Sequence, residues 1–495
     1  MTTLDIIYDF PTLWHNVRTM FAFDSAQPLM PTSGLFWVLF MVFLPLYALL
    51  KHRKAMMMVF VIAFGLFMSY KSSGWLMLLL LFTTTVDWKL AQLIHNGKPR
   101  YRKALMWLSI AVSVSILGFF KYGNFILFNW KALVGGNFQP MDLVLPLGIS
   151  FYTFKSISYV VDVYKGKLEP TSSWLEYAFY LSFFPSLIAG PITRATTFLP
   201  QIQANKPATK SEAYQGLWQV IVGVIKKAVI ADYFAQYTNI VFGLAAGQGV
   251  PLLLGAIVFS WQLYCDFAGY SDIAIGLGRI MGYDLGVNFN FPYRALNVTD
   301  LWHRWHITLS TWLRDYIYIP LGGNRRGKVR QYANLFVTML VGGLWHGAAW
   351  TFVVWGALHG AALCIHKALR PWLKTITDTP TVKVLSILLT FIFWTFTLIF
   401  FRADSMHDVG TYLRDIFANW EFSQFGAILT QRKLLCILLL VITAAHYLPK
   451  KFHTAAERFF VDSPWIVKLM VFVLVVQLVA AFATEEVQPF IYNKF

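Results

Sequence analysis

Long apolar runs with few charges recur along this chain of 495 residues, from residue 34 to residue 484. Hydrophobic residues make up 57% of the sequence and charged residues 13%, against about 25% charged residues in soluble domains. We count about eleven to thirteen runs that are long enough to cross a bilayer as helices of ~20 residues. Lipid offers no hydrogen-bond partner to a bare backbone, and the runs lack the alternation of a membrane barrel. The sequence therefore predicts an all-α integral membrane protein built as a multi-span helical bundle.

The net charge of +17 comes largely from short loops between the apolar runs. This distribution is typical of cytoplasmic loops under the positive-inside rule, and it does not require a nucleic-acid partner. With the basic loops inside, residues 1–33 form an extracytoplasmic segment, residues 34–484 the membrane core and residues 485–495 an extracytoplasmic tail. The basic clusters that give this orientation are at residues 51–54, 98–103, 165–167, 325–330, 370–374 and 450–458.

Residues 282–330 are too polar for simple membrane spans. Irregular backbone at membrane depth is tolerated only where it is buried in protein or lines a cavity. We therefore expect short or re-entrant helices around a central tunnel. Asp266 and Asp272 are further charges inside an apolar run, and we expect them to pair with Arg279, Arg304 or a histidine.

His346 lies in the sequence Gly-Gly-Leu-Trp-His-Gly, next to Trp345. An ionisable residue inside a membrane segment is costly and usually has a function, and histidine transfers protons near neutral pH. The glycines allow another helix or a substrate to approach closely. His346 is therefore either a general base in a buried tunnel or a histidine that packs between helices. His359, in Trp-Gly-Ala-Leu-His-Gly, could support it from a neighbouring helix.

His306 is the second candidate catalytic residue, and it stands three residues after His303. No carboxylate or cysteine follows at metal-ligand spacing, so we expect no metal site and a role in orienting a substrate or a second group. His303 and Arg304 fit a headgroup region. Arg314 and Asp315 could support catalysis or form a structural pair.

The last six residues read Phe-Ile-Tyr-Asn-Lys-Phe. Aromatic residues are common where a span meets water, so this segment could be an interfacial anchor. Alternatively, Tyr492 could hold its phenol at the mouth of a tunnel and carry an acyl ester.

Several long motifs resemble the membrane-bound O-acyltransferase family, in its bacterial alginate O-acetyltransferase branch. These motifs are WHRWHITLSTWLRDYIYIPLGGNRRG, GGLWHGAAWTFVVWGALHG, LPLGISFYTFKSISYVVDVYKG, FFPSLIAGPITR and WQLYCDFAGYSDIAIGLGRIMGY. The resemblance covers about residues 143–401 and the C-terminal residues, whereas the first hundred or so residues match poorly. It implies that His346, in the Trp-His-Gly motif, is catalytic, and that His306, in Trp-His-x-x-Leu-Ser, is the second polar position. It also implies that Tyr492 lies in a tail similar to one thought to carry an acyl group.

The resemblance implies a protein of the bacterial inner membrane that passes an acyl group, first of all acetyl, to an extracytoplasmic polysaccharide. The donor would be acetyl-CoA or another acyl thioester, such as an acyl carrier protein, with no permanently bound cofactor. A separate extracytoplasmic transferase would receive the acyl group. Two alternatives remain open. One is D-alanyl transfer to teichoic acid, and the other, from a different class, is a transporter or flippase.

Overall fold

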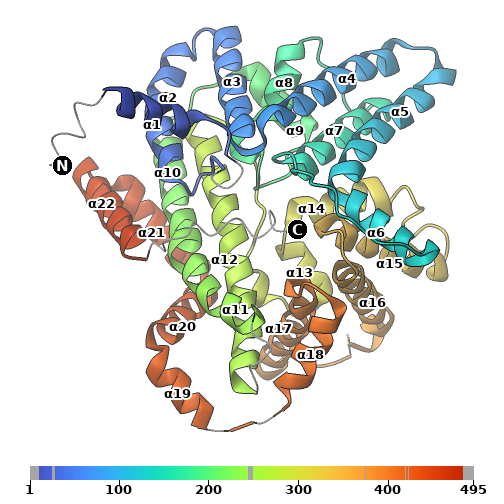
Figure 1. Cartoon of the computed structure of the whole chain (residues 1–495), viewed down its shortest axis with the longest axis vertical. Helices are drawn as coiled ribbons and strands as arrows, with labels where there is room; N and C mark the ends of the chain where they lie inside the picture. The colour runs from blue at the N-terminus through green and yellow to red at the C-terminus, as the bar shows by residue number, and fades with distance from the viewer. Residues whose placement is uncertain are drawn as a thin grey trace. The chain divides into compact units, whose positions relative to one another are not determined.

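Helices form the regular structure of this protein in the computed structural model, which describes residues 10–24, 28–243, 249–373, 375–418, 420–421 and 423–482 (Figure 1). No strand occurs within those ranges. The chain divides into two compact units, the first made of Met1–Ile188 with Arg194–Pro207 and the second of Ala189–Thr193 with Ala208–Phe495. The prediction of an all-α multi-span membrane protein is confirmed.

The two units divide the helices in chain order. The first unit contains α1 (Phe10–Phe21), α2 (Gly34–Leu50), α3 (Lys54–Ser73), α4 (Met77–Asn96), α5 (Pro99–Leu117), α6 (Gly123–Val134), α7 (Ile149–Tyr164), α8 (Trp174–Ser182) and α9 (Ala195–Ala204). The second contains α10 (Lys210–Val224), α11 (Asp232–Gly243), α12 (Val250–Ile280), α13 (Val298–Arg304), α14 (Ile307–Leu313), α15 (Lys328–His346), α16 (Trp350–Leu373), α17 (Pro380–Arg402), α18 (Met406–Ile416), α19 (Ser423–Gln431), α20 (Lys433–Tyr447), α21 (Lys450–Asp462) and α22 (Trp465–Phe482).

Six continuous helical segments among the described residues are long and apolar enough to cross a membrane, or seven if the bent pair α19–α20 is one span. Sequence counting gave about eleven to thirteen runs of sufficient length. The two numbers differ because several apolar runs form shorter helices, such as the 17-residue α2 and the 16-residue α7. In addition, α3 and α4 lie in one continuous 43-residue segment. The predicted sidedness of residues 1–33, 34–484 and 485–495 stays a prediction.

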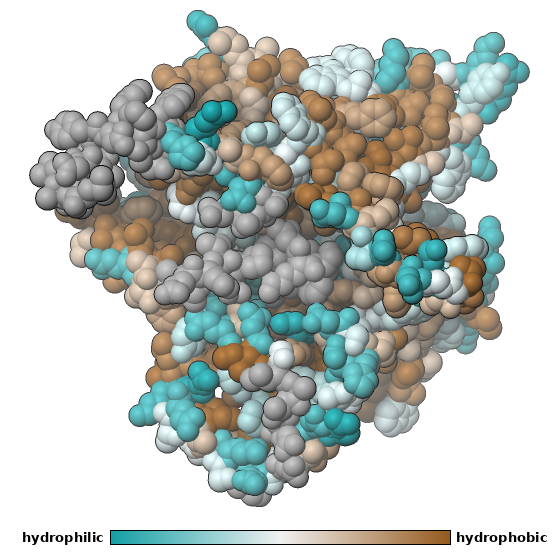
Figure 2. Space-filling model, in the orientation of Figure 1, coloured by the Kyte–Doolittle hydropathy of each residue, from teal (hydrophilic) through white to brown (hydrophobic). Residues whose placement is uncertain are grey.

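Exposed apolar side chains cover much of the helix surface (Figure 2). On α22, for example, Met470 and Leu474 are exposed, while only Lys468 and Val475 are buried. Water would make such a surface unfavourable, whereas hydrocarbon accommodates it. The surface therefore agrees with a protein that is integral to a membrane.

Helices α10 and α12 of the second unit lie side by side and are in contact through two pairs of glycines (Figure 1). A Cβ atom on Gly216 would lie 2.6 Å from the carbonyl oxygen of Gly276, and one on Gly223 would lie 2.6 Å from that of Gly269. Real side chains do not approach a backbone so closely. The four positions therefore admit only glycine at this separation of the helices, as in other closely packed membrane helices.

Charged residues of the second unit pair across the same helices. Between α10 and α11 the chain forms a π-helical segment, Ile225–Ala231, which carries Lys226 and Lys227. Lys226 forms an ion pair of 2.7 Å with Asp272, and Lys227 forms one of 2.6 Å with Asp266. The expectation that these aspartates pair with Arg279, Arg304 or a histidine is wrong. The adjacent lysines compensate them instead, because the π-helical segment packs against α12.

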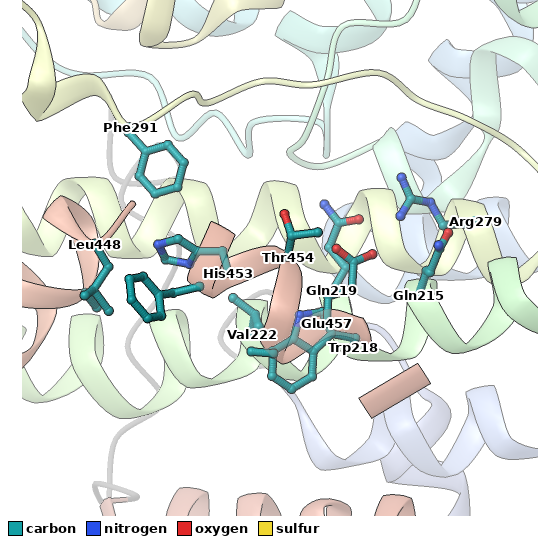
Figure 3. Close-up of a pocket in the computed structure, with 13 residues that line it drawn as sticks. Gln215, Trp218, Gln219, Val222, Arg279, Phe291, Leu448, His453, Thr454 and Glu457 are labelled. Carbon is teal, nitrogen blue, oxygen red and sulfur yellow. The ribbon is translucent and has the colours of Figure 1, made fainter. Parts of the chain in front are cut away.

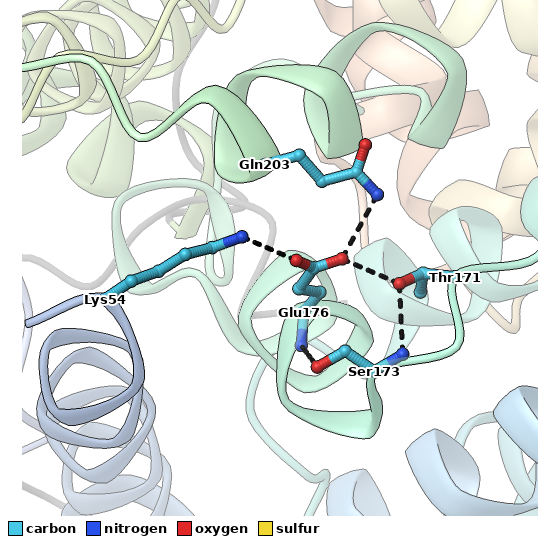
Figure 4. A network of polar contacts seen from close by, with 5 residues as sticks. All are labelled: Lys54, Thr171, Ser173, Glu176 and Gln203. Carbon is cyan, nitrogen blue, oxygen red and sulfur yellow. Dashed lines mark hydrogen bonds and ion pairs between the residues drawn. The ribbon is translucent and has the colours of Figure 1, made fainter.

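A polar network links the loops of the first unit around Glu176, near the start of α8 (Figure 4). The Lys54 ammonium lies 2.6 Å from one carboxylate oxygen of Glu176, while Thr171 and Gln203 donate to the other oxygen at 2.7 and 3.1 Å. Burial raises the pKa of Glu176, but these three donors more than compensate, so the pKa lies below its ordinary value. The network joins α3, α8, α9 and the loop before α8.

Candidate active site

His346 is the last residue of α15 and is almost fully buried. Its ring lies with its centroid 4.9 Å from that of Trp355, nearly edge-on, and 5.2 Å from that of Phe401. The local packing depends on glycines, because a Cβ atom on Gly356 of α16 would lie 2.6 Å from the carbonyl oxygen of Met339. The expected close approach of a second helix beside His346 therefore exists, and the partner helix is α16.

His306 is the N-cap residue of α14 and is fully buried. Its backbone is left-handed, with φ of 40°, which is uncommon for a residue other than glycine. Its Nδ1 atom lies 3.0 Å from Oδ1 of Asn288, and its ring stands edge-on to that of Phe267 at 4.6 Å. Its Nε2 atom is buried and has no hydrogen-bond partner among the described residues.

Asn288 determines which nitrogen of His306 carries the proton. The Asn288 amide nitrogen donates to the hydroxyl of Ser271 at 3.0 Å, so the oxygen faces His306. That oxygen also accepts a 2.9 Å hydrogen bond from the hydroxyl of Thr308. An amide oxygen can only accept, so Nδ1 of His306 must donate, and Nε2 of the neutral ring keeps a lone pair. The neutral ring is thus held as a proton acceptor at Nε2.

His359 completes a continuous row of ring contacts. It is fully buried on α16, where its Nε2 lies 3.1 Å from the hydroxyl of Thr397 and its ring lies 4.6 Å from that of Trp355. The row starts at His306, whose ring centroid lies 5.9 Å from that of Trp345, and the Trp345 centroid lies 5.0 Å from that of His346. From His346 the row continues through Trp355 to His359. The structure therefore brings together four predicted site residues: His306, Trp345, His346 and His359.

The remaining predicted site residues do not join this row. Asp272 pairs with Lys226 and accepts from Gln219 at 3.3 Å. Arg314 and Asp315 form a 2.8 Å ion pair with each other, and the arginine side chain is 61% exposed. Such a surface pair contributes little energy and fits the structural alternative.

Other positions that sequence reasoning had considered also lie apart from the row. His303 is exposed, whereas His306 is buried, so the two histidines do not share one face. Arg304 forms an ion pair with Asp300, four residues earlier, at 2.8 Å. Tyr492 lies outside the described residues, and its suggested role as an acyl carrier stays a prediction.

Sequence reasoning did not find the partners of His306. Asn288 stands eighteen residues before His306, in a segment without regular structure, so no helical spacing connects the two. Thr308 is only two residues from His306, but a hydroxyl at that distance has many other uses. The available signal was the unusual polarity of residues 282–330 as a whole.

Two indole groups beside the histidines add hydrogen-bond donors. The Nε1 atoms of Trp302 and Trp355 are buried and find no acceptor within the described part of the chain. Buried donors are rarely left without a partner, so an acceptor such as a carbonyl oxygen of a bound substrate would satisfy them. A buried proton acceptor and buried N–H donors are the kinds of group that acyl transfer uses.

Comparison with known proteins agrees with this chemistry. Residues 104–406 match the model of the membrane-bound O-acyltransferase family. The chain is 34% identical to a probable alginate O-acetylase of Pseudomonas putida over 94% of its length and 99% of the relative. It is 40% identical to a peptidoglycan O-acetyltransferase of Helicobacter pylori over 63% of its length and 64% of the relative. It is 30% identical to a teichoic acid D-alanyltransferase of Bacillus subtilis over 54% of its length and 71% of the relative.

Proposed function

This chain belongs to the membrane-bound O-acyltransferase family and is an O-acyltransferase, and we propose that it passes acetyl groups across the membrane for O-acetylation of an extracytoplasmic polysaccharide. The similar proteins named for acetyl transfer, to alginate or to peptidoglycan, support acetyl as the acyl group and a glycan as the final acceptor. We place the protein in the bacterial inner membrane, with acetyl-CoA or another cytosolic acyl thioester as the donor.

The observation that carries the proposal is the buried row of histidines and tryptophans around His346. His346 takes the proton of the attacking hydroxyl while the hydroxyl oxygen bonds to the thioester carbonyl carbon. The carbon–sulfur bond then breaks, and the thiolate leaves and takes the proton back from the imidazolium. General-base help is needed because an unassisted hydroxyl is a poor nucleophile at neutral pH.

His306 and the indoles have supporting parts in this proposal. Nε2 of His306 is held as an acceptor by the Asn288 hydrogen bond, so it can orient a hydroxyl without taking its proton fully. The indole N–H of Trp355, whose ring contacts His346, can donate to the oxygen that becomes negative during attack. Donors aimed at such an oxygen typically lower the barrier to acyl transfer by about 3–4 kcal/mol.

The acyl group must cross ~30 Å of hydrocarbon between donor and polymer. We propose that Tyr492 is the first acceptor and that a separate extracytoplasmic transferase moves the acyl group on to the polysaccharide. Transfer of D-alanine from a carrier protein is the alternative within the same family. The alginate relative supports acetyl transfer more strongly, because its similarity spans nearly the whole chain.

The test uses membranes that contain the full-length protein and labelled acetyl-CoA. His346→Ala should lower acetyl incorporation by about 10²–10⁴-fold, the usual effect of removing a general base. His303→Ala is the matched control, because His303 is exposed and lies outside the row. Normal incorporation in the His346 variant would refute the catalytic assignment. Tyr492→Phe should abolish a labelled tyrosine ester in the tail peptide, and normal polysaccharide acetylation in that variant would refute the carrier role.

A further inference from the structure

A pocket lined by both apolar and polar side chains lies in the second unit, between α10, the end of α12 and α21 (Figure 3). Its volume is about 540 Å³, within the range of roughly 300–1,000 Å³ that is usual for small-molecule sites. None of its lining residues belongs to the row around His346. The acyltransferase mechanism therefore leaves this pocket without a role.

Opposite charges line this pocket. Arg279 lies with Gln215 at one end, and Glu457 lies beside Gln219 nearer the middle (Figure 3). Within the described ranges, neither Arg279 nor Glu457 forms an ion pair with any side chain. A cation and an anion in one pocket, neither of them held in an ion pair, suit a ligand that carries both charges.

The rim of the pocket is apolar and open to the surroundings. Leu448 and Phe452 line it and are 43% and 51% exposed. Trp218 supplies an aromatic wall further in, and such a ring attracts a cation over its face. A ligand with a zwitterionic head and an apolar tail would satisfy both the charges and the rim.

Helix α21 has the composition of a helix that lies in a membrane interface. It carries basic residues at its start and a further one at Arg458, and Phe459 is 70% exposed. Phe460 on its other face is buried against Ile221 of α10 and Val475 of α22. Amphipathic helices with basic and aromatic residues lie at the level of phospholipid headgroups. The pocket beneath α21 is thus within reach of lipid.

We propose that this pocket binds the headgroup of a phospholipid with a primary ammonium, such as phosphatidylethanolamine. The phosphate accepts hydrogen bonds from Arg279 and Gln215, and the ammonium donates to Glu457. A purely anionic ligand fits less well, because the Glu457 carboxylate would repel it. A quaternary ammonium fits less well too, because it has no N–H to donate.

The experiment measures lipid binding to the purified full-length protein in detergent by native mass spectrometry. Phosphatidylethanolamine, phosphatidylglycerol and phosphatidylcholine are titrated separately. Glu457→Gln should weaken binding of phosphatidylethanolamine about tenfold, equivalent to ~1.4 kcal/mol. The same change should strengthen binding of phosphatidylglycerol, because it removes a carboxylate that repels an anionic lipid. Arg279→Gln should weaken both, because it removes the phosphate contact. Asp462→Asn and Arg458→Gln are matched controls on α21, where both residues are exposed and outside the pocket lining.

Three results would overturn the proposal. One is equal binding of the three lipids that does not change in Glu457→Gln. Another is binding of soluble phosphoethanolamine as tight as that of the lipid, which would indicate a site for a free aminoalkyl phosphate. The third is displacement of the lipid by coenzyme A, which would indicate part of a donor site. Elution of each variant as a monodisperse species in gel filtration confirms that the comparison is between folded proteins.

Discussion

At the scale of single residues, the hydrogen bond between His306 and Asn288 is the feature that most directly shapes the proposed chemistry. The Asn288 oxygen accepts from Nδ1 of His306 and from the Thr308 hydroxyl, and its nitrogen donates to Ser271. Asn288 is itself fully buried, so replacing it leaves several polar groups without partners. In the proposed reaction Asn288 acts through His306, as a positioning residue.

We predict that Asn288→Ala lowers acetyl transfer by about 10–100-fold, as removal of a partner that orients an active-site histidine commonly does. The decisive measurement is a double-mutant cycle. If Asn288 acts through His306, then Asn288→Ala combined with His306→Ala should lose little more activity than His306→Ala alone. Losses that multiply would mean that Asn288 supports activity by another route.

The charge of Glu176 should make the stability of the protein depend on pH. Its pKa lies below the ordinary value of 4.5, because the Lys54, Thr171 and Gln203 hydrogen bonds outweigh the opposing effect of burial. A carboxyl with a lowered folded pKa stabilises the protein above its unfolded pKa, and the contribution is lost as pH falls through the folded value. The stabilising contribution is therefore present at neutral pH and lost below about pH 4.5.

Glu176→Gln should accordingly destabilise the protein at pH 7 by about 1–2 kcal/mol, since Lys54 remains partly exposed and the pair is partly screened. The measurement is the thermal unfolding midpoint of the purified protein in detergent, compared with wild type at several pH values. The difference should shrink towards zero at acid pH. Glu169→Gln, at an exposed position, provides the control and should match wild type throughout. A difference that is independent of pH would contradict the assignment.

A residue of the site could be predicted where its immediate neighbours in the sequence were unusual, and not where its partner came from a distant segment. His346 and His306 stood out because a histidine among tryptophans and glycines in an apolar sequence is unusual. The partners of Asp266 and Asp272 could not be foreseen, because Lys226 and Lys227 come from a π-helical segment some forty residues earlier. Sequence gives no sign of where a helix changes its winding, and one residue of extra turn decides which side chain faces α12.

At the scale of helices, glycine contacts determine how closely neighbouring helices approach. Glycines beside His346 predicted a close helix contact, and Gly343 and Gly356 make it between α15 and α16. The equivalent contacts of Gly223 and Gly269 between α10 and α12 were not predicted, because glycines in two distant segments do not show by themselves that those segments are in contact. The number of spans was also difficult to predict, because an apolar run indicates burial in protein or lipid but does not give the helix ends.

We predict that Gly356→Ala lowers acetyl transfer at least tenfold and lowers stability by about 1–3 kcal/mol, the usual cost of overpacking. The new Cβ atom would lie 2.6 Å from the carbonyl oxygen of Met339, so α15 must move, and His346 moves with it. Gly410→Ala in α18 is the matched control. No atom lies within 4 Å of a Cβ there, so stability should stay equal or rise slightly. Equal activity of the two variants would mean that the spacing of α15 and α16 does not position His346.

At the scale of the whole molecule, the predicted sidedness decides the direction of acyl transfer. The loop at residues 325–330 is basic and is assigned to the cytoplasm, whereas residues 404–432 carry mixed charge and are assigned to the outside. Helices α15, α16 and α17 connect the two regions. Of these, α16 and α17 are long and apolar enough to cross a membrane, so the predicted sidedness requires α15 to cross it as well. We therefore predict that a cysteine at His407 reacts with an impermeant thiol reagent in intact cells, while one at Lys328 reacts only after the membrane is opened. Both positions are exposed, so accessibility does not bias the comparison, and Cys265, Cys364 and Cys436 are replaced beforehand. Labelling of Lys328→Cys alone would reverse the orientation. The reversed orientation would be incompatible with export of acyl groups from a cytosolic thioester, even if His346 proved essential for catalysis.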